Sequence, residues 1–238
     1  MTPIAETVCT TCGERLASIV ASAENCAAER RCAACRSAEP AFHKAAAYGS
    51  YSGGLRDLIH LLKYQHVRPA AGVLGRMLFE VISQLSDGFD SRVPLVVPVP
   101  LHSRKLRERG FNQSELIARA ALKLKPSGLD LVLKPELLMR RRATESQTGL
   151  SRDQRQRNMR GAFAITLLKE VQDREILLVD DVLTTGTTAS ECARVLRRAG
   201  ATRVWVATVA RTLKAEAAWA LRELTEEEEL LASRAAHA

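Results

Sequence analysis

Two adjacent acids, Asp180 and Asp181, stand directly before a turn of small, hydroxylated residues in the stretch ILLVDDVLTTGTT, residues 176–188. We call this turn, residues 184–188, the phosphate loop. Its backbone N–H groups and the start of the helix expected after it are suited to a phosphate monoester. Carboxylates do not bind phosphate, but they accept hydrogen bonds from sugar hydroxyls and attract Mg²⁺. A ligand with a phosphate and vicinal hydroxyls, such as ribose 5-phosphate, satisfies both halves.

This stretch has other interpretations. An ordinary strand-to-helix turn can carry acids without binding a ligand. The letters LLVDD also resemble a receiver-domain strand, but that domain needs a phospho-acceptor Asp on a later strand, and the TTGTT turn argues against it. The sequence has neither a GxxxxGKS/T loop nor a GxGxxG fingerprint, so these two phosphate loops are excluded.

Five of the six cysteines lie in the first 35 residues. Four of them form two CxxC pairs, which is the spacing of a structural zinc site with four thiolates. The expected ligands are Cys9, Cys12, Cys32 and Cys35. Metal-free, degenerate cysteines are the alternative, and Cys26 leaves the choice of ligands slightly open. Cys192 stands apart and is expected to be a buried apolar filler.

The chain is basic and poor in aromatic residues. Its 238 residues carry a formal net charge of +8, which favours phosphorylated small molecules or nucleic acid as partners. Solubility alone is the other explanation of this charge. Aromatic residues make up 4%, which leaves little for stacking single-stranded nucleic acid, so any such binding is expected to be weak and sequence-blind.

Hydrophobic periodicity predicts an α/β fold with a largely parallel sheet and flanking helices. Helices are expected over 52–65, 71–85, 111–122 and 187–200. Buried strands are expected over 95–99, 174–181 and 202–211, and the segment 129–140 is strand-like at its start. The last strand, helix and strand form a βαβ unit, which requires parallel strands.

Local signals mark several element ends. Ser52 is expected to cap the first helix, and Asn112 with Glu115 has the spacing of a capping box. Gly200 closes the last helix. Arg104, Lys105, Arg107 and Arg109 fall in a predicted loop. Residues 140–160, with seven arginines, are expected to be a long loop with a short helix.

In this order along the chain, four segments resemble the ComF family of competence-associated phosphoribosyltransferase-like proteins. They are YGSYSGGLRDLIHLLKYQ, VVPVPLHSRKLRERGFNQSELIA, LMRRRATESQTGLSRDQRQRNMRGAF and the 13-residue stretch above, which resembles the phosphoribosyl-pyrophosphate (PRPP) motif of type I phosphoribosyltransferases. The resemblance covers roughly residues 5–212. It implies a type I phosphoribosyltransferase fold that is preceded by a small module like a zinc ribbon.

The resemblance also implies roles for residues. Asp180 and Asp181 would hold the ribose hydroxyls, with Mg²⁺ between those hydroxyls and pyrophosphate. The 5-phosphate motif would comprise Val182, Leu183, Thr184, Thr185, Gly186, Thr187 and Thr188. Candidates for pyrophosphate or lid contacts are Lys63, Arg104, Lys105, Arg109, Arg140 and Arg142. A mobile lid is expected within 140–160, and a cis peptide near Pro98 or Pro100.

The expected organisation is a zinc-binding module over 1–40, a phosphoribosyltransferase-like domain over 41–212 and a tail over 213–238. The start lacks the features of a signal peptide and no apolar run approaches a membrane span, so we expect a cytoplasmic protein without membrane insertion. Two functions stay open. One is an enzyme that uses Mg²⁺ and PRPP on an unknown nitrogen acceptor, with partners in the competence machinery. The other is a non-catalytic factor that binds nucleotides or single-stranded DNA.

Overall fold

The computed structural model describes residues 8–16, 30–90, 94–124, 129–142 and 159–213. In chain order its elements are α1 (Ala33–Ser37), β1 (Lys44–Ser50), α2 (Gly53–Tyr64), α3 (Ala70–Ser86), β2 (Leu95–Pro98), α4 (Ser103–Arg109), α5 (Gln113–Leu122), β3 (Val132–Leu133), β4 (Leu138–Arg140), β5 (Phe163–Ile165), α7 (Leu168–Val171), β6 (Glu175–Leu183), α8 (Thr187–Arg198) and β7 (Arg203–Arg211).

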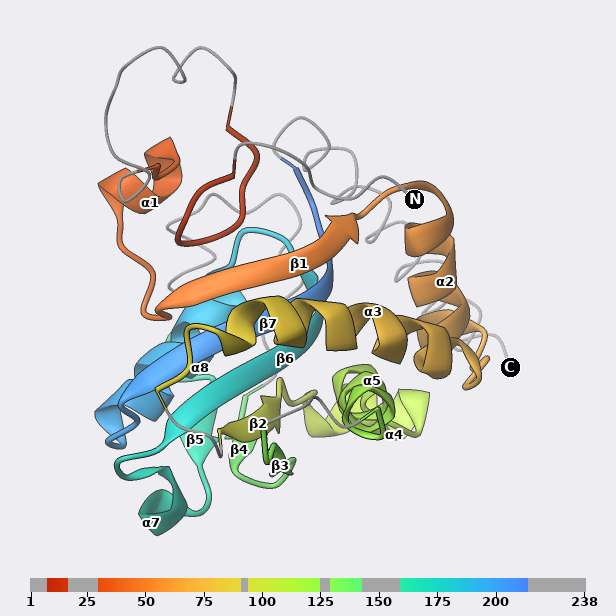
Figure 1. Cartoon of the computed structure of the whole chain (residues 1–238). Helices are drawn as coiled ribbons and strands as arrows, with labels where there is room; N and C mark the ends of the chain where they lie inside the picture. The colour runs from red at the N-terminus through yellow and green to blue at the C-terminus, as the bar shows by residue number, and fades with distance from the viewer. Residues whose placement is uncertain (1–7, 17–29, 91–93, 125–128, 143–158, 214–238) are drawn as a thin grey trace.

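Five strands form one parallel sheet in the order β1-β7-β6-β2-β3, and β4 and β5 form a separate antiparallel pair. Helix α3 covers one face of the sheet and α8 the other (Figure 1). The α/β fold with a largely parallel sheet and flanking helices is therefore confirmed. Among the described residues, no helix is long and apolar enough to cross a membrane.

Alternate residues of β6 belong to two buried hydrophobic clusters, one on each face of the sheet. Ile176 and Leu178 pack with Cys192 and Leu196 of α8, whereas Leu177 and Val179 pack with the helices of the opposite face. Burial on both faces explains why the strand appears in the sequence as a continuous apolar run. It also holds the carboxyl end of β6 rigidly between two helical layers.

The basic segment before α5 was expected to be a loop, and this was wrong, because it forms α4. The ring Nδ1 of His102 accepts a hydrogen bond from the backbone N–H of Arg104, and Gly110 ends the helix in the left-handed region at φ 71°. Arg104 and Glu108 add an ion pair one turn apart at 2.8 Å. The helix has no buried residue, so hydrophobic periodicity could not reveal it.

Three smaller expectations also need correction. Ser52 occupies the N-cap of α2 but makes no capping bond, because its hydroxyl faces that of Ser50 instead. Asn112 does cap α5, whereas Glu115 pairs with Arg119 at 2.8 Å rather than closing a capping box. The described residues contain no cis peptide, and they include Pro98 and Pro100, so both of those bonds are trans.

Candidate functional site

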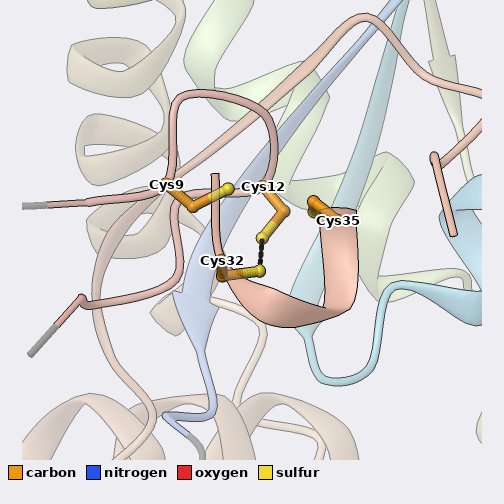
Figure 2. A group of neighbouring side chains, drawn as sticks. All are labelled: Cys9, Cys12, Cys32 and Cys35. Carbon is orange, nitrogen blue, oxygen red and sulfur yellow. Dashed lines mark hydrogen bonds between the residues drawn. The ribbon is translucent and has the colours of Figure 1, made fainter. Parts of the chain in front are cut away.

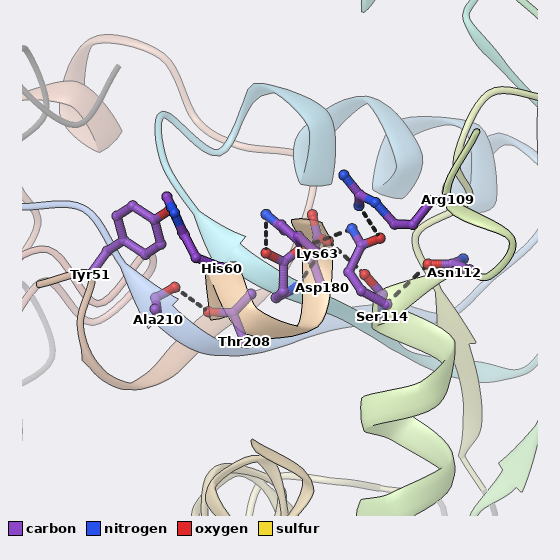
Figure 3. A network of polar contacts seen from close by, with 11 residues as sticks. Tyr51, His60, Lys63, Arg109, Asn112, Ser114, Asp180, Thr208 and Ala210 are labelled. Carbon is purple, nitrogen blue, oxygen red and sulfur yellow. Dashed lines mark hydrogen bonds and ion pairs between the residues drawn. The ribbon is translucent and has the colours of Figure 1, made fainter. Parts of the chain in front are cut away.

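The acidic pair lies near the carboxyl end of β6, with Asp180 in register with Thr208 of β7. The last turn of α2 and the first turn of α5 reach the same edge of the sheet, where they bring Lys63 and Ser114 to the acids (Figure 3). Asn112 anchors this arrangement, since its side chain caps α5 and also donates to the carbonyl of Val99 at 3.0 Å. This edge is where parallel α/β sheets bind ligands.

Asp181 is buried, and each of its carboxylate oxygens contacts a protein group. Only 3% of the residue is exposed. The Lys63 ammonium forms an ion pair with Oδ2, and the Gln113 amide donates to Oδ1 at 3.1 Å. Burial alone would raise the pKa of Asp181, but the charge and hydrogen bond of Lys63 outweigh it and hold that pKa below its usual range. The same pairing raises the pKa of Lys63 against the effect of its own burial. Asp181 therefore stays ionised in a neutral ion pair.

Asp180 has a different environment from its neighbour. Its Oδ1 accepts from the Ser114 hydroxyl at 2.9 Å and from the backbone N–H of Asp181 at 3.0 Å. Burial, followed by the negative charge of Asp181, raises the pKa of Asp180 to about 7. Near neutral pH the two acids thus carry between one and two negative charges, and Asp180 can gain or lose a proton when a ligand arrives.

Arg109, one of the expected pyrophosphate contacts, belongs to the same network. Its Nη1 donates to the Gln113 side-chain oxygen at 2.6 Å, and its guanidinium carbon lies 5.6 Å from the centroid of the Tyr64 ring. Because Gln113 accepts from Arg109 and donates to Asp181, its amide is fixed in one orientation. A continuous series of hydrogen bonds therefore runs from Arg109 of α4 through Gln113 to Asp181.

The other predicted cations lie on α4, in β4 and shortly after β4. Arg104 and Lys105 are exposed on α4. Arg140, in β4, stacks on Phe163 at 5.6 Å and forms a backbone bridge with His102 beside the start of α4. Arg142 donates to the carbonyl of Arg160 at 3.3 Å. The predicted lid segment 143–158 lies outside the described residues.

The phosphate loop turns sharply into α8. Gly186 is the N-cap of this 12-residue helix at φ 75° and ψ 3°, a left-handed conformation that favours glycine. The hydroxyls of Thr185 and Thr187 lie 2.9 Å apart, and Thr184 and Thr188 are partly exposed beside them. Backbone N–H groups at the start of α8 have no partners within the helix. The loop thus combines hydroxyl and N–H donors where an anion could approach. Val182 and Leu183, which complete the predicted motif, are still in β6.

The four CxxC cysteines converge between the loop 8–16 and α1 (Figure 2). They are buried, and their Sγ atoms all lie within 4.8 Å of one another. The Cys12 and Cys32 sulfurs are 3.7 Å apart, close to the ~3.8 Å edge of a tetrahedron with Zn–S bonds of about 2.3 Å. The donor set and geometry fit Zn²⁺. Cys26 lies outside the described residues.

Cys192 is fully buried beneath the sheet in α8, as expected of a filler. Burial raises the pKa of its thiol well above the usual value. It therefore lacks the thiolate character that a nucleophile requires.

Sequence reasoning missed Gln113 and Ser114 as site residues. Both face the acidic pair from the first turn of α5, and both are buried although polar. A buried polar side chain needs a partner, but the sequence does not reveal that these two residues are buried. Only the packing of α5 against β6 shows that this partner is the acidic pair.

The chain is similar to known proteins over most of its length. Residues 136–226, which include the acidic pair and the phosphate loop, match the phosphoribosyl transferase domain family. The DNA utilization protein YhgH of Escherichia coli (strain K12) is 35% identical over 183 residues, 76% of this chain and 78% of that protein. Competence protein F of Haemophilus influenzae is 30% identical over 76% of this chain and 79% of that protein. A hypoxanthine phosphoribosyl transferase of Trypanosoma cruzi superposes with a TM-score of 0.39 at 12% identity, over 60% of this chain and 66% of that one.

Proposed function

Because the chain belongs to the ComF family of phosphoribosyltransferase-like proteins, we propose that it binds PRPP with Mg²⁺ at the carboxyl end of β6 and transfers the phosphoribosyl group to a nitrogen acceptor. The observation that carries this proposal is the junction of the acidic pair and the phosphate loop on one strand, with Lys63 buried against Asp181. The names of the relatives suggest a role in the uptake or use of DNA.

In this proposal the phosphate loop binds the 5-phosphate. The left-handed Gly186 turns the chain so that the first N–H groups of α8 and the threonine hydroxyls can point at one anion. The helix dipole adds to the attraction. No lysine is required in the loop itself.

In this proposal the two acids have different roles. Both oxygens of Asp181 already contact Lys63 or Gln113, so this residue neutralises the charge of Lys63 and orients α2 and α5. Asp180 is partly exposed and its Oδ2 has no hydrogen-bond partner among the described residues, which leaves it to accept from a ribose hydroxyl. Asp180 would help to hold Mg²⁺ together with the ligand, and the ion would supply positive charge to the leaving group.

Cations near α4 would stabilise the pyrophosphate as it leaves. Arg109 is held by Gln113 and Tyr64, so its guanidinium is placed in advance and need not be ordered during the reaction. The C1–O bond to pyrophosphate breaks, the ribose becomes oxocarbenium-like, and the lone pair of the acceptor nitrogen forms the new bond. We propose that the exposed Arg104 and Lys105 assist in capturing the polyanion.

Two further parts of the proposal concern the whole chain. The first 40 residues would form a structural module that binds one Zn²⁺ through its four buried cysteines, and residues 41–212 would form the domain that binds PRPP. The CxxC pairs supply a closed set of four thiolates, as in structural rather than catalytic zinc sites.

A second candidate function is a non-catalytic factor that binds single-stranded DNA. The observation that favours it is α4, a helix with no buried residue and with four basic residues among seven. Affinity that depends only on such contacts should fall by about one power of salt concentration for each phosphate contacted. Salt titrations of DNA binding, with and without PRPP, separate a shared site from an independent one.

Calorimetric titration of the full chain with PRPP in the presence of Mg²⁺ tests the proposed ligand. We expect Asp180→Asn to weaken PRPP binding by about 10- to 100-fold, the loss of one charged hydrogen bond, while sparing inorganic phosphate. Asp57→Asn is the matched control, because Asp57 is exposed on α2. Pyrophosphate release with a panel of bases and amines then tests turnover. If the protein binds PRPP but releases pyrophosphate with none of the acceptors, the result favours the non-catalytic binding function.

A further inference from the structure

Arg211, the last residue of β7, lies beside the strand that leads into the phosphate loop. It is in register with Leu183, the last residue of β6, and the N–H of Thr212 donates to the Leu183 carbonyl at 3.1 Å. Thr184 follows Leu183 directly. The end of β7 is therefore hydrogen-bonded to the end of β6, from which the phosphate loop begins.

Arg211 is buried, with only 5% of the residue exposed. Its guanidinium contacts the cysteine module, defined as residues 8–16 and 30–38. Its Nη1 donates to the Cys12 carbonyl at 2.6 Å. Its Nη2 lies 2.8 Å from a carboxylate oxygen of Glu14 and 3.6 Å from the Cys12 sulfur. One planar cation thus holds the backbone, the sulfur and the acid of a single CxxC loop, which is a geometry that a lysine cannot reproduce.

A second connection joins the cysteine module to the other side of the phosphate loop. The chain that leaves α1 places the N–H of Ala41 3.1 Å from the Ser190 hydroxyl in the first turn of α8. The Phe42 ring lies against Gly186, 3.8 Å from where a Cβ on that glycine would stand. The phosphate loop is therefore supported at both ends by segments that the cysteine module fixes.

Metal binding would tighten the same contacts. A Zn²⁺ held by four thiolates carries a formal charge of −2, and an N–H donor to one of those thiolates is a typical second contact of such sites. Arg211 can supply that donor to Cys12 while Glu14 keeps the guanidinium in place. Without metal, no bonds to a common ion fix the four sulfurs, so Cys12, and hence Arg211, would be held less firmly.

We propose that Arg211 is a positioning residue that couples Zn²⁺ in the cysteine module to ligand binding at the phosphate loop. This rests on the proposed function, since it assumes that the loop binds the phosphate of a phosphoribosyl ligand. Coupling between two sites is reciprocal: Zn²⁺ raises the affinity for the ligand by the same factor by which the ligand raises the affinity for Zn²⁺. The expected factor is on the order of 10-fold, within the usual span of coupling energies.

Ribose 5-phosphate is the probe for the test, because it carries the phosphate and the hydroxyls but needs no Mg²⁺ that a chelator would remove. In the full chain, its affinity is measured by calorimetry with Zn²⁺ bound and after removal of Zn²⁺. The affinity for Zn²⁺ is measured separately by competition with a chromogenic chelator, with and without ribose 5-phosphate. In the wild type, the ratio of the affinities for ribose 5-phosphate with and without Zn²⁺ should equal the ratio of the affinities for Zn²⁺ with and without ribose 5-phosphate.

Variants of Arg211 show whether this residue carries the coupling. Arg211→Met, loaded with Zn²⁺, should bind ribose 5-phosphate on the order of 10-fold more weakly and should show both ratios near one. Arg211→Lys should recover little, because it keeps the charge but not the planar fork. Arg203→Met is the matched control, since Arg203 lies at the far end of β7 and pairs with Asp90 at 2.6 Å.

Ribose 5-phosphate that binds the wild type equally with and without Zn²⁺, and leaves the affinity for Zn²⁺ unchanged, overturns the coupling while the proposed function stands. Coupling that survives in Arg211→Met overturns the role of Arg211. If Arg211→Met does not fold, the result with Arg211→Lys decides. A wild type loaded with Zn²⁺ that binds neither ribose 5-phosphate nor PRPP overturns the proposed function itself.

Discussion

Replacing Lys63 with methionine removes the cation that faces Asp181 and leaves a carboxylate in a buried position. The Lys63 side chain is 12% exposed and that of Asp181 4%, so water can replace little of the lost interaction. Removing one partner of a buried pair costs about 3–5 kcal/mol, because the remaining charge stays desolvated. In a domain of this size, that loss lowers the melting temperature by roughly 10 °C.

Urea unfolding followed by circular dichroism measures this cost, and a double-variant cycle isolates the pair. Lys63→Met/Asp181→Asn should recover part of the lost stability, since no unpaired carboxylate remains. Lys134→Met is the matched control: its ion pair with Glu170 is more exposed, at 26% and 39%, so its loss should destabilise the protein far less. A Lys63→Met variant as stable as Lys134→Met would refute the buried ion pair.

The remaining predictions concern Asp180, the phosphate loop and the cysteines. The raised pKa of Asp180 favours the protonated folded state, so its contribution to stability is fully present below about pH 3.8 and is lost as the pH rises through about 7. Asp180→Asn should therefore gain stability relative to the wild type between pH 5 and pH 8 in urea titrations, and a constant difference would contradict the shift. Gly186→Ala should cost about 1 kcal/mol through its left-handed backbone, whereas Gly72→Ala in α3 should not destabilise the protein. Elemental analysis after dialysis should find near one Zn²⁺ per chain, lowered by Cys9→Ser; full occupancy in a Cys9→Ser/Cys35→Ser variant would exclude a site with four thiolates.

The sequence predicted the parts of the fold that have a strong local signal. The apolar run of β6 and the periodic helices α2, α3, α5 and α8 all lie where periodicity placed them. β1 was missed, because KAAAYGS has three alanines and no β-branched residue, and only pairing with β7 makes it a strand. The exposed α4 was missed because its stability comes from a cap and a terminal glycine, which have no periodicity.

For the site, the acidic pair and the phosphate loop could be identified because they are contiguous in the sequence. The partners of the acids could not, because each comes from another helix. Lys63 was named only as one of several cations, and no local pattern distinguishes a lysine buried against Asp181 from one on the surface. The same holds for Arg211, whose contacts with Cys12 and Glu14 depend on how the cysteine module packs on β7.

A crystal structure of the full chain with Mg²⁺ and PRPP tests the central claim most directly. The account predicts the 5-phosphate within hydrogen-bonding distance of the N–H groups of the phosphate loop, a ribose hydroxyl on Asp180, and Asp181 still paired with Lys63. PRPP held only by the exposed cations of α4, with the phosphate loop empty, would contradict it.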